Sequence, residues 1–376
     1  MKNYPTVLLL VFCGIHSVLA QTNYEIPHVP ANLTAPSASQ LTLPRVSQSA
    51  SVKQVIGITE IELNYHRPGI YGRELLGGAD AIIPKNQVWR AGANENTTIS
   101  FSHAVKVNGN ELAAGTYGLF MIPEENEWTI ILSNANADWG SFFYDEKNDA
   151  LRTKVTVQKL DEFKNWLSYS LENPEFDRVQ LRMVFGDIAL QLPINVDVDK
   201  IVIQSLESEL RGSSLANPVA YNQAAQYCLT RDVSLDKGLA WSQRTTRNNR
   251  EFTYLMTESG LLKKLGNEAE ATELKEEAFS IANAGDLTTY GFEIMGPKFT
   301  KNRSEAHDAF KAALELNPNR AFPLFAMGKF HETDPSRTKK DIKTAIEYYN
   351  KARENTKIEG IIRNMTQLIA LLESEL

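Results

Sequence analysis

The chain has 376 residues, of which 43% are hydrophobic, and it carries a formal net charge of −7 at pH 7. This length suits two or three domains, and this composition excludes general disorder because each domain can bury a core. Residues 45–200 carry 15 Lys and Arg against 21 Asp and Glu, and residues 201–376 carry 23 against 24. Because neither part has a basic excess, we expect no nucleic-acid partner.

Residues 1–20 have the pattern of a secretory signal peptide. Lys2 supplies the positive start, an apolar run from Val7 to Phe12 follows, and Ala20 ends a small-residue cleavage pattern. The run is too short to cross a bilayer comfortably. We therefore predict cleavage before Gln21, a periplasmic or secreted protein, and no integral membrane segment after cleavage. An uncleaved anchor and a lipoprotein attached through Cys13 are the alternatives.

Residues 21–44 contain four prolines among Thr, Ser, Asn and Ala, which predicts a flexible, extended leader. Cleavage before Gln21 would leave Cys228 as the single cysteine of the mature chain, so no intramolecular disulfide is expected. Cys228 lies among apolar residues with a helical period, which predicts a buried packing residue.

Residues 45–200 alternate between apolar and polar side chains, the period of strands with one buried face. The clearest run is Ile61, Leu63 and Tyr65, and the longest extends from Ile188 to Val198. Turn residues interrupt the alternation at Asn108-Gly109, Pro123–Asn126, Asn173-Pro174 and Gly186-Asp187. Eight to ten short strands at this spacing predict an antiparallel β-sandwich, with a related barrel as the alternative.

Residues 201–376 have the period of amphipathic helices, and the helical segments repeat one another. Ala271, Ala306 and Ala345 correspond, with offsets of 35 and 39 residues, so we predict a helical solenoid. The runs EAHDAFKAALELNPN (305–319), AFPLFAMGKF (321–330) and TAIEYYNKA (344–352) resemble tetratricopeptide repeats. The resemblance covers about 220–352, with a capping helix at 361–372, and it implies a protein or peptide partner. An unrelated helical bundle is the alternative.

Four stretches of the first domain resemble an uncharacterised family of exported bacterial proteins, the domain-of-unknown-function family 2911. They are GIYGRELLGG (69–78), VWRAGANENTTISF (88–101), KVNGNELAAGTYGLFMIP (106–123) and EWTIIL (127–132). The resemblance implies export and a β-rich domain that is often followed by tetratricopeptide-like helices. It supplies no activity and no catalytic residues.

Two polar segments at strand ends, 64–73 and 89–98, form the candidate site, because loops at the ends of a sandwich often carry function. Arginines beside Glu95 would hold a carboxylate or phosphate, and the rings of Tyr71 and Trp89 would contact a sugar or peptide. The candidate ligand-binding residues are His66, Arg67, Arg73, Trp89, Arg90, Asn94, Glu95 and Thr97.

Three functional hypotheses stay open. The first is an exported binding protein whose β-domain holds a small-molecule, sugar or peptide ligand and whose helices bind a protein segment. The second is a hydrolase or transferase that uses His66 and Glu95 for proton transfer. The third is an assembly module. The same polar residues also have a structural interpretation, in which Glu95 pairs with Arg90 or Arg67, Trp89 belongs to the core and the Asn/Thr run caps loop backbone.

Metal and cofactor sites are not predicted. The histidines are scattered without zinc-site spacing, and there is no Gly-rich phosphate loop or GxSxG motif. Asp145, Glu146, Asn148 and Asp149 crowd one loop without the glycine of a calcium-binding EF-hand, so a solvated loop is expected there.

Overall fold

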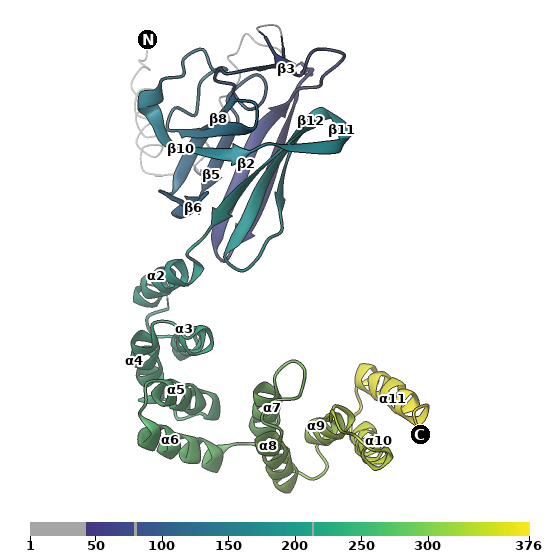
Figure 1. Cartoon of the computed structure of the whole chain (residues 1–376). Coiled ribbons are helices and arrows are strands. Elements are labelled where there is room, and N and C mark those ends of the chain that lie inside the picture. The colour runs from purple at the N-terminus through teal and green to yellow at the C-terminus, as the bar shows by residue number, and fades with distance from the viewer. Residues whose placement is uncertain (1–42, 79–80, 213) are drawn as a thin grey trace, which may run out of the picture.

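The computed structural model describes residues 43–78, 81–212 and 214–376 (Figure 1). The predicted signal peptide, 1–20, and residues 21–42 of the predicted leader lie outside these ranges. Strands occupy the first part of the described chain and helices the second. No helix among the described residues is long and apolar enough to cross a membrane.

The strands form two antiparallel sheets and one short parallel pair. The six-stranded sheet has the order β1 (Gln48–Ile56), β2 (Thr59–Arg67), β5 (Thr98–Phe101), β8 (Gly115–Pro123), β9 (Glu127–Ser133), β10 (Asp149–Thr156). The four-stranded sheet has the order β11 (Gln158–Glu172), β12 (Arg178–Asn195), β6 (Val105–Val107), β7 (Asn110–Leu112). The parallel pair is β3 (Leu76–Gly77) with β4 (Ile83–Pro84).

One apolar core joins the inner faces of the two sheets. Ile61 and Leu63 of β2 lie in it with Leu181 of β12, as the period-two pattern predicts. The outer face of the six-stranded sheet buries Phe120 and Ile131, and Phe120 packs edge-on against Tyr144 from the β9–β10 connection. The β9–β10 connection, residues 134–148, includes the short helix η1 (Glu146–Asn148). The two packed antiparallel sheets confirm the predicted β-sandwich.

The predicted hairpin at Asn108-Gly109 is confirmed. Val107 pairs with Asn110, which leaves two residues between β6 and β7. Asn108 and Gly109 have φ angles of 47° and 80°. Positive φ at both positions is what a two-residue hairpin turn requires, and Asn-Gly accommodates it at little cost.

The predicted turn at Gly186-Asp187 is wrong, because both residues lie within the single long strand β12. The β11–β12 register shifts around the pair Lys164–Gly186, and Gly186 has a φ of 63°. Such a bulge changes which residues face the core. Phe185 and the odd positions before it are buried, whereas Ile188 and the even positions after it are buried. One irregular strand thus has the sequence pattern of two short ones.

Ten helices follow the strands in the described part of the chain. They are α2 (Val198–Arg211), α3 (Pro218–Arg231), α4 (Leu235–Thr246), α5 (Phe252–Lys264), α6 (Glu268–Ile281), α7 (Ala284–Met295), α8 (Arg303–Leu316), α9 (Ala321–Glu332), α10 (Lys339–Glu354) and α11 (Glu359–Glu373). The alternating run predicted from Ile188 to Val198 is too long as a strand, because β12 ends at Asn195 and Val198 begins α2.

The helices pack as consecutive pairs, α3 with α4, α5 with α6, α7 with α8 and α9 with α10, and α11 packs on α10 (Figure 1). The small residues that repeat along the sequence lie where helices meet: Ala271, Ala306 and Ala345 are all buried. Cys228 is also buried, as predicted, and a Cβ on Gly238 would lie 2.6 Å from its Cβ. This arrangement confirms the predicted tetratricopeptide-like solenoid.

The first helix contacts the strand-rich domain. Val198 and Ile201 of α2 belong to the apolar core of the sandwich. The next helix adds a second contact, because the Arg231 guanidinium lies 3.8 Å from the ring centre of Phe176 in the β11–β12 turn. Strand structure ends at Asn195 and helix structure begins at Val198. A division between functional domains at residues 200/201 stays a prediction.

Candidate functional site

The segment from Trp89 to Thr98 enters the six-stranded sheet beside β8. The backbone of Trp89 exchanges hydrogen bonds with that of Met121, 2.7 and 2.9 Å long. Its side chain is only 4% exposed and packs edge-on against Trp128. Thr97 is also fully buried, and its hydroxyl donates to the Ala91 carbonyl at 3.1 Å. The assignment of Trp89 and Thr97 to a ligand surface is therefore corrected, because core packing and loop backbone occupy both side chains.

The other predicted segment, 64–73, contacts β11 through residues 67–70. Arg67 Nε donates to the Leu167 carbonyl at 2.9 Å. Arg73 donates to the carbonyls of Gly69 and Ile70, at 2.7 and 3.3 Å. Neither arginine forms an ion pair with Glu95. The expectation that these arginines lie beside Glu95 and hold a ligand with it is therefore corrected for Arg67 and Arg73, which hold loop backbone instead.

Glu95 is paired with Arg45, a residue that the sequence did not single out. Arg45 Nη1 lies 2.7 Å from each carboxylate oxygen of Glu95. On the other side, His66 Nδ1 lies 3.5 Å from Glu95 Oε2. Asn94, with a φ of 60°, donates from its amide to the Ser47 carbonyl at 3.2 Å. Arg45 and Ser47 thus pack against the part of the 89–98 segment that contains Asn94 and Glu95.

These contacts set opposite charge states for Glu95 and His66. Burial acts to raise the pKa of Glu95, but the hydrogen bond from Arg45 and the other nearby donors outweigh it, so this pKa is lowered. Burial lowers the pKa of His66, and although Glu95 acts to raise it, the net shift is downward from 6.5. At neutral pH, Glu95 is therefore ionised and His66 is neutral.

We expect Glu95→Gln to lower the pKa of His66 further, because the substitution removes the carboxylate that favours the imidazolium. An NMR titration of the His66 ring measures this, with Glu111→Gln at an exposed ion pair as the control. Because the folded pKa lies below the unfolded one, the stability contributed by neutral His66 is present above pH 6.5 and is lost as the pH falls through the folded pKa. An unchanged or raised pKa in Glu95→Gln would contradict this assignment.

Arg90 differs from the other arginines of the site. Its Nη1 donates to the Asn94 carbonyl at 2.8 Å. Burial lowers the pKa of Arg90, yet no carboxylate among the described residues lies within ion-pair distance of it. Arg90 therefore carries a partly desolvated positive charge that the described chain does not neutralise.

The β9–β10 connection lies beside Glu95 and Arg90 and carries exposed aromatic side chains. The sequence did not predict that it belongs to the site. Trp139, Phe142 and Phe143 are 50%, 77% and 70% exposed. The backbones of Glu95 and Trp139 form an isolated antiparallel bridge, and Arg45 lies 5.9 Å from the Trp139 ring centre. We call Arg45, Arg90, Trp139, Phe142 and Phe143 the arginine–aromatic surface.

Gly140 brings Arg90 and Phe142 together. A Cβ at this position would lie 3.0 Å from Arg90 Nη1 and 3.1 Å from the Phe142 ring. Gly140 has a φ of 70°, which glycine adopts readily. The guanidinium and the exposed ring thus border the same glycine.

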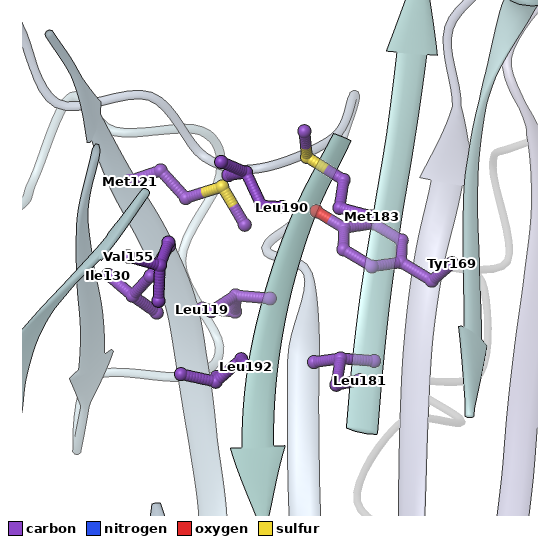
Figure 2. Close-up of a pocket in the computed structure, with 9 residues that line it drawn as sticks. All are labelled: Leu119, Met121, Ile130, Val155, Tyr169, Leu181, Met183, Leu190 and Leu192. Carbon is purple, nitrogen blue, oxygen red and sulfur yellow. The ribbon is translucent and has the colours of Figure 1, made fainter. Parts of the chain in front are cut away.

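The arginine–aromatic surface lies apart from two hollows of the strand-rich domain. A cavity of about 10 Å³ lies between the sheets and is lined almost entirely by apolar side chains, with Tyr169 among them (Figure 2). A shallow depression of about 200 Å³ lies over β2, β5 and β8 and includes Glu60 and Glu62. Neither includes a predicted site residue. Within residues 43–78, 81–212 and 214–376, no group of three or more His, Cys, Asp or Glu is arranged to hold a metal ion.

Three acidic residues at the end of the β9–β10 connection and the start of β10 are held by neighbouring groups. Asp149 accepts from the Tyr144 hydroxyl at 2.7 Å, and Arg152 Nη1 lies 2.7 Å from Glu146. The Asp145 side chain caps η1 by accepting from the backbone of Lys147. These carboxylates therefore stabilise the connection that carries the exposed aromatic residues.

Among solved structures, the chain is similar to MamA at 12% identity and a TM-score of 0.25, over 41% of this chain and 85% of that one. It is also similar to residues 41-end of MamA from Desulfovibrio magneticus RS-1, at 14% identity and a TM-score of 0.22, over 42% and 94% of the two chains. The APC/C hetero-tetramer Cut9-Hcn1 matches at 12% identity and a TM-score of 0.26, over 41% of this chain and 28% of that one.

No curated protein matches the chain. The helical repeats are assigned from the packing of α3 to α10 described above. For the strand-rich domain a family is found: residues 47–194, which contain most of the predicted and observed site, match the family described as "Protein of unknown function (DUF2911)".

Proposed function

We propose that this chain is an exported binding protein, periplasmic or secreted after removal of residues 1–20. Its strand-rich domain would bind a ligand that carries a carboxylate or phosphate next to a flat or apolar group. Its helical repeats would bind a protein segment. The observation that carries the ligand proposal is the partly buried Arg90, without a carboxylate partner among the described residues, beside the exposed ring of Phe142 on a connection that also carries the exposed Trp139 and Phe143.

The charge of Arg90 favours an anionic ligand. A guanidinium presents several N–H donors in a fixed plane, and one Nη1 bond to Asn94 leaves others available. Because Arg90 is partly desolvated, an anion that reaches it would be screened less by water than at a fully exposed arginine.

The aromatic side chains favour a ligand with a flat or apolar part. Exposed aromatic side chains on one short segment are a candidate binding surface, and Trp139, Phe142 and Phe143 are all exposed within residues 139–143. Phe142 borders the same glycine as Arg90. One ligand can therefore contact the cation and a ring together.

A matched pair of small probes tests the proposal. We expect phenylpropionate, which has a ring and a carboxylate, to raise the Tm of the full chain more than phenylpropionamide does, because ligand binding stabilises the folded state. Arg90→Gln should remove this difference, and Trp139→Ala should weaken the response to both probes. Inorganic phosphate, which lacks the ring, should give a smaller shift that also depends on Arg90.

Phe163→Ala is the control, because Phe163 is another exposed aromatic residue, on β11. Circular dichroism spectra establish that each variant is folded, and Trp139 permits a separate test because half of its surface is exposed. Equal responses of the wild type to the charged and uncharged probes would contradict the proposal. Wild-type responses in both Arg90→Gln and Trp139→Ala would do so as well.

The 3.5 Å contact between His66 Nδ1 and Glu95 Oε2 supports a second candidate, a hydrolase or transferase. A neutral imidazole beside a carboxylate has the protonation state of a general base. In this case His66→Gln and Glu95→Gln would each abolish turnover of chromogenic ester substrates, whereas Arg90→Gln would mainly raise KM. Turnover that is equal in the wild type and His66→Gln would exclude this use of the pair.

A further inference from the structure

Four phenylalanines gather where α7 and α9 lie together, and Phe292 is at their centre. Its ring centre lies 5.9 Å from that of Phe299, 5.9 Å from that of Phe322 and 6.4 Å from that of Phe325. Phe292 belongs to α7, Phe322 and Phe325 belong to α9, and Phe299 lies in the α7–α8 connection. We call these four residues the phenylalanine surface.

The core of the repeats does not cover this surface. Phe322 is 41% exposed, and the other three rings are partly exposed. The fully buried layer beneath them consists of residues such as Met295, Phe310 and Met327. Rings of this size are normally buried when the fold provides a place for them, so an exposed group of them is a candidate binding surface.

Cations slightly outnumber carboxylates along the segments that carry the phenylalanine surface, although the whole chain carries −7. Residues 292–305 and 315–332 include five Lys and Arg, which are Lys298, Lys301, Arg303, Arg320 and Lys329, and four glutamates, which are Glu293, Glu305, Glu315 and Glu332. Glu305 and Glu332 are paired with lysines. Arg303 and Lys329 are paired with Asp334 and Glu332. The other three lie within ion-pair distance of no carboxylate among the described residues.

Two of the cations are placed next to the elements that carry the rings. Lys329 Nζ lies 5.7 Å from the ring centre of Phe299. The Arg320 guanidinium approaches the start of α7, where its Nη2 would lie 3.4 Å from a Cβ on Gly285. Arg320 also precedes Phe322 by two residues at the start of α9. A ligand on the exposed ring of Phe322 would therefore lie near positive charge.

We propose that the phenylalanine surface binds an acidic peptide segment that inserts a large apolar or aromatic side chain against Phe292 and Phe322. This inference rests on the proposed function, in which the helices bind a protein segment, and it adds the position and chemistry of that segment. The apolar anchor supplies most of the affinity, because buried rings dominate peptide recognition by helical grooves. The carboxylates select the partner and speed its association by charge complementarity with Lys298, Lys301 and Arg320.

Three fluorescent peptides of equal length test the inference with the full chain. The first alternates acidic residues with phenylalanine, the second replaces the acidic residues by lysine, and the third replaces phenylalanine by serine. We expect fluorescence anisotropy to show the tightest binding for the acidic phenylalanine peptide, with an affinity that falls as salt rises. Phe322→Ala and Arg320→Glu should each weaken this binding about tenfold.

The controls are Leu316→Ala and Lys311→Glu, which change an exposed apolar and an exposed basic residue of α8. Both should bind like the wild type, as should Trp139→Ala in the strand-rich domain. Wild-type affinity in Phe322→Ala and Arg320→Glu would overturn the inference. Tighter binding of the lysine peptide would overturn the acidic partner but leave peptide recognition by the helices intact. Failure of every peptide to bind would count against the helical part of the proposed function itself.

Discussion

Gly291→Ala is expected to lower the free energy of unfolding of the helical repeats by about 1–3 kcal/mol, the usual cost of an overpacked core. A Cβ at this position would lie 2.3 Å from Cε1 of Phe310, whose ring is fully buried on the neighbouring helix α8. Because the ring is fully buried, any shift of it would displace the side chains packed around it. Alanine's better helix propensity, worth about 1 kcal/mol, offsets only part of this cost.

Gly360→Ala is the matched control, since Gly360 also lies in a helix, α11, but a Cβ there would meet nothing within 4 Å. This substitution should raise the stability by up to about 1 kcal/mol. Urea unfolding followed by circular dichroism measures both variants. Opposite signs support the close contact of α7 with α8, and recovery of stability in a Gly291→Ala/Phe310→Leu double variant would locate the cost at that ring. A stabilising Gly291→Ala would contradict this packing.

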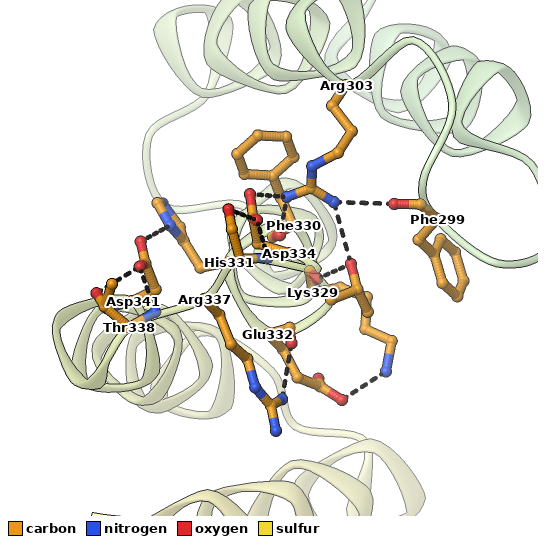
Figure 3. Close-up of polar contacts among 12 residues, drawn as sticks. Phe299, Arg303, Lys329, Phe330, His331, Glu332, Asp334, Arg337, Thr338 and Asp341 are labelled. Atoms are coloured by element: carbon orange, nitrogen blue, oxygen red, sulfur yellow. Dashed lines mark hydrogen bonds and ion pairs between the residues drawn. The ribbon is translucent and has the colours of Figure 1, made fainter.

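Arg303→Met is expected to lower the stability of the repeats by about 1.5–3 kcal/mol, the range for hydrogen bonds to a charged group. Arg303 Nη1 donates to the Phe299 carbonyl at 2.8 Å, and Nη2 donates to the Phe330 carbonyl at 2.6 Å and to Asp334 at 3.0 Å (Figure 3). The guanidinium also lies 4.2 Å from the Phe330 ring centre. Its removal would leave two carbonyls and a carboxylate without this donor.

Urea unfolding again provides the measurement, with Lys340→Met at an exposed position of α10 as the control. Methionine retains much of the apolar length of arginine, so the comparison isolates the guanidinium. Arg303 begins α8, and two of its partners, Phe330 and Asp334, lie near the end of α9 and just after it, so the variant should also weaken the contact between these helices. A change no larger than that of Lys340→Met would show that the network in Figure 3 contributes little to stability.

Most of the architecture could be predicted from the sequence because burial leaves a periodic pattern. The alternation around Ile61 and the repeated alanines of α6, α8 and α10 mark faces that the fold buries. The bulge at Gly186 could not be distinguished from a turn, since both interrupt the alternation and both favour glycine. Only the pairing with β11 shows that the strand continues.

The candidate site was predictable only in part. His66, Arg90, Asn94 and Glu95 were found because polar residues gather at strand ends, but nothing local indicated that Arg45 pairs with Glu95 across fifty residues. The Trp139–Phe143 segment lacks periodicity, and it reaches Arg90 only because β5, β8 and β9 are neighbours in the sheet. The one local feature that could have predicted this part of the site is the presence of three large aromatic residues in a short loop. Trp89 and Thr97 each carry a polar group, but the fold buries both side chains.

The central claim, that Arg90 and Trp139 belong to one ligand site, is tested most directly by fluorine NMR of the fluorotryptophan-labelled full chain. The chain has five tryptophans, so each resonance can be assigned by substitution. Trp89 and Trp128 are buried, whereas Trp139 lies on the arginine–aromatic surface and Trp166 packs against Tyr71. We predict that phenylpropionate shifts the Trp139 resonance and that Arg90→Gln abolishes the shift. A Trp139 resonance that stays unchanged at saturating phenylpropionate, or one that shifts equally in Arg90→Gln, would contradict the claim.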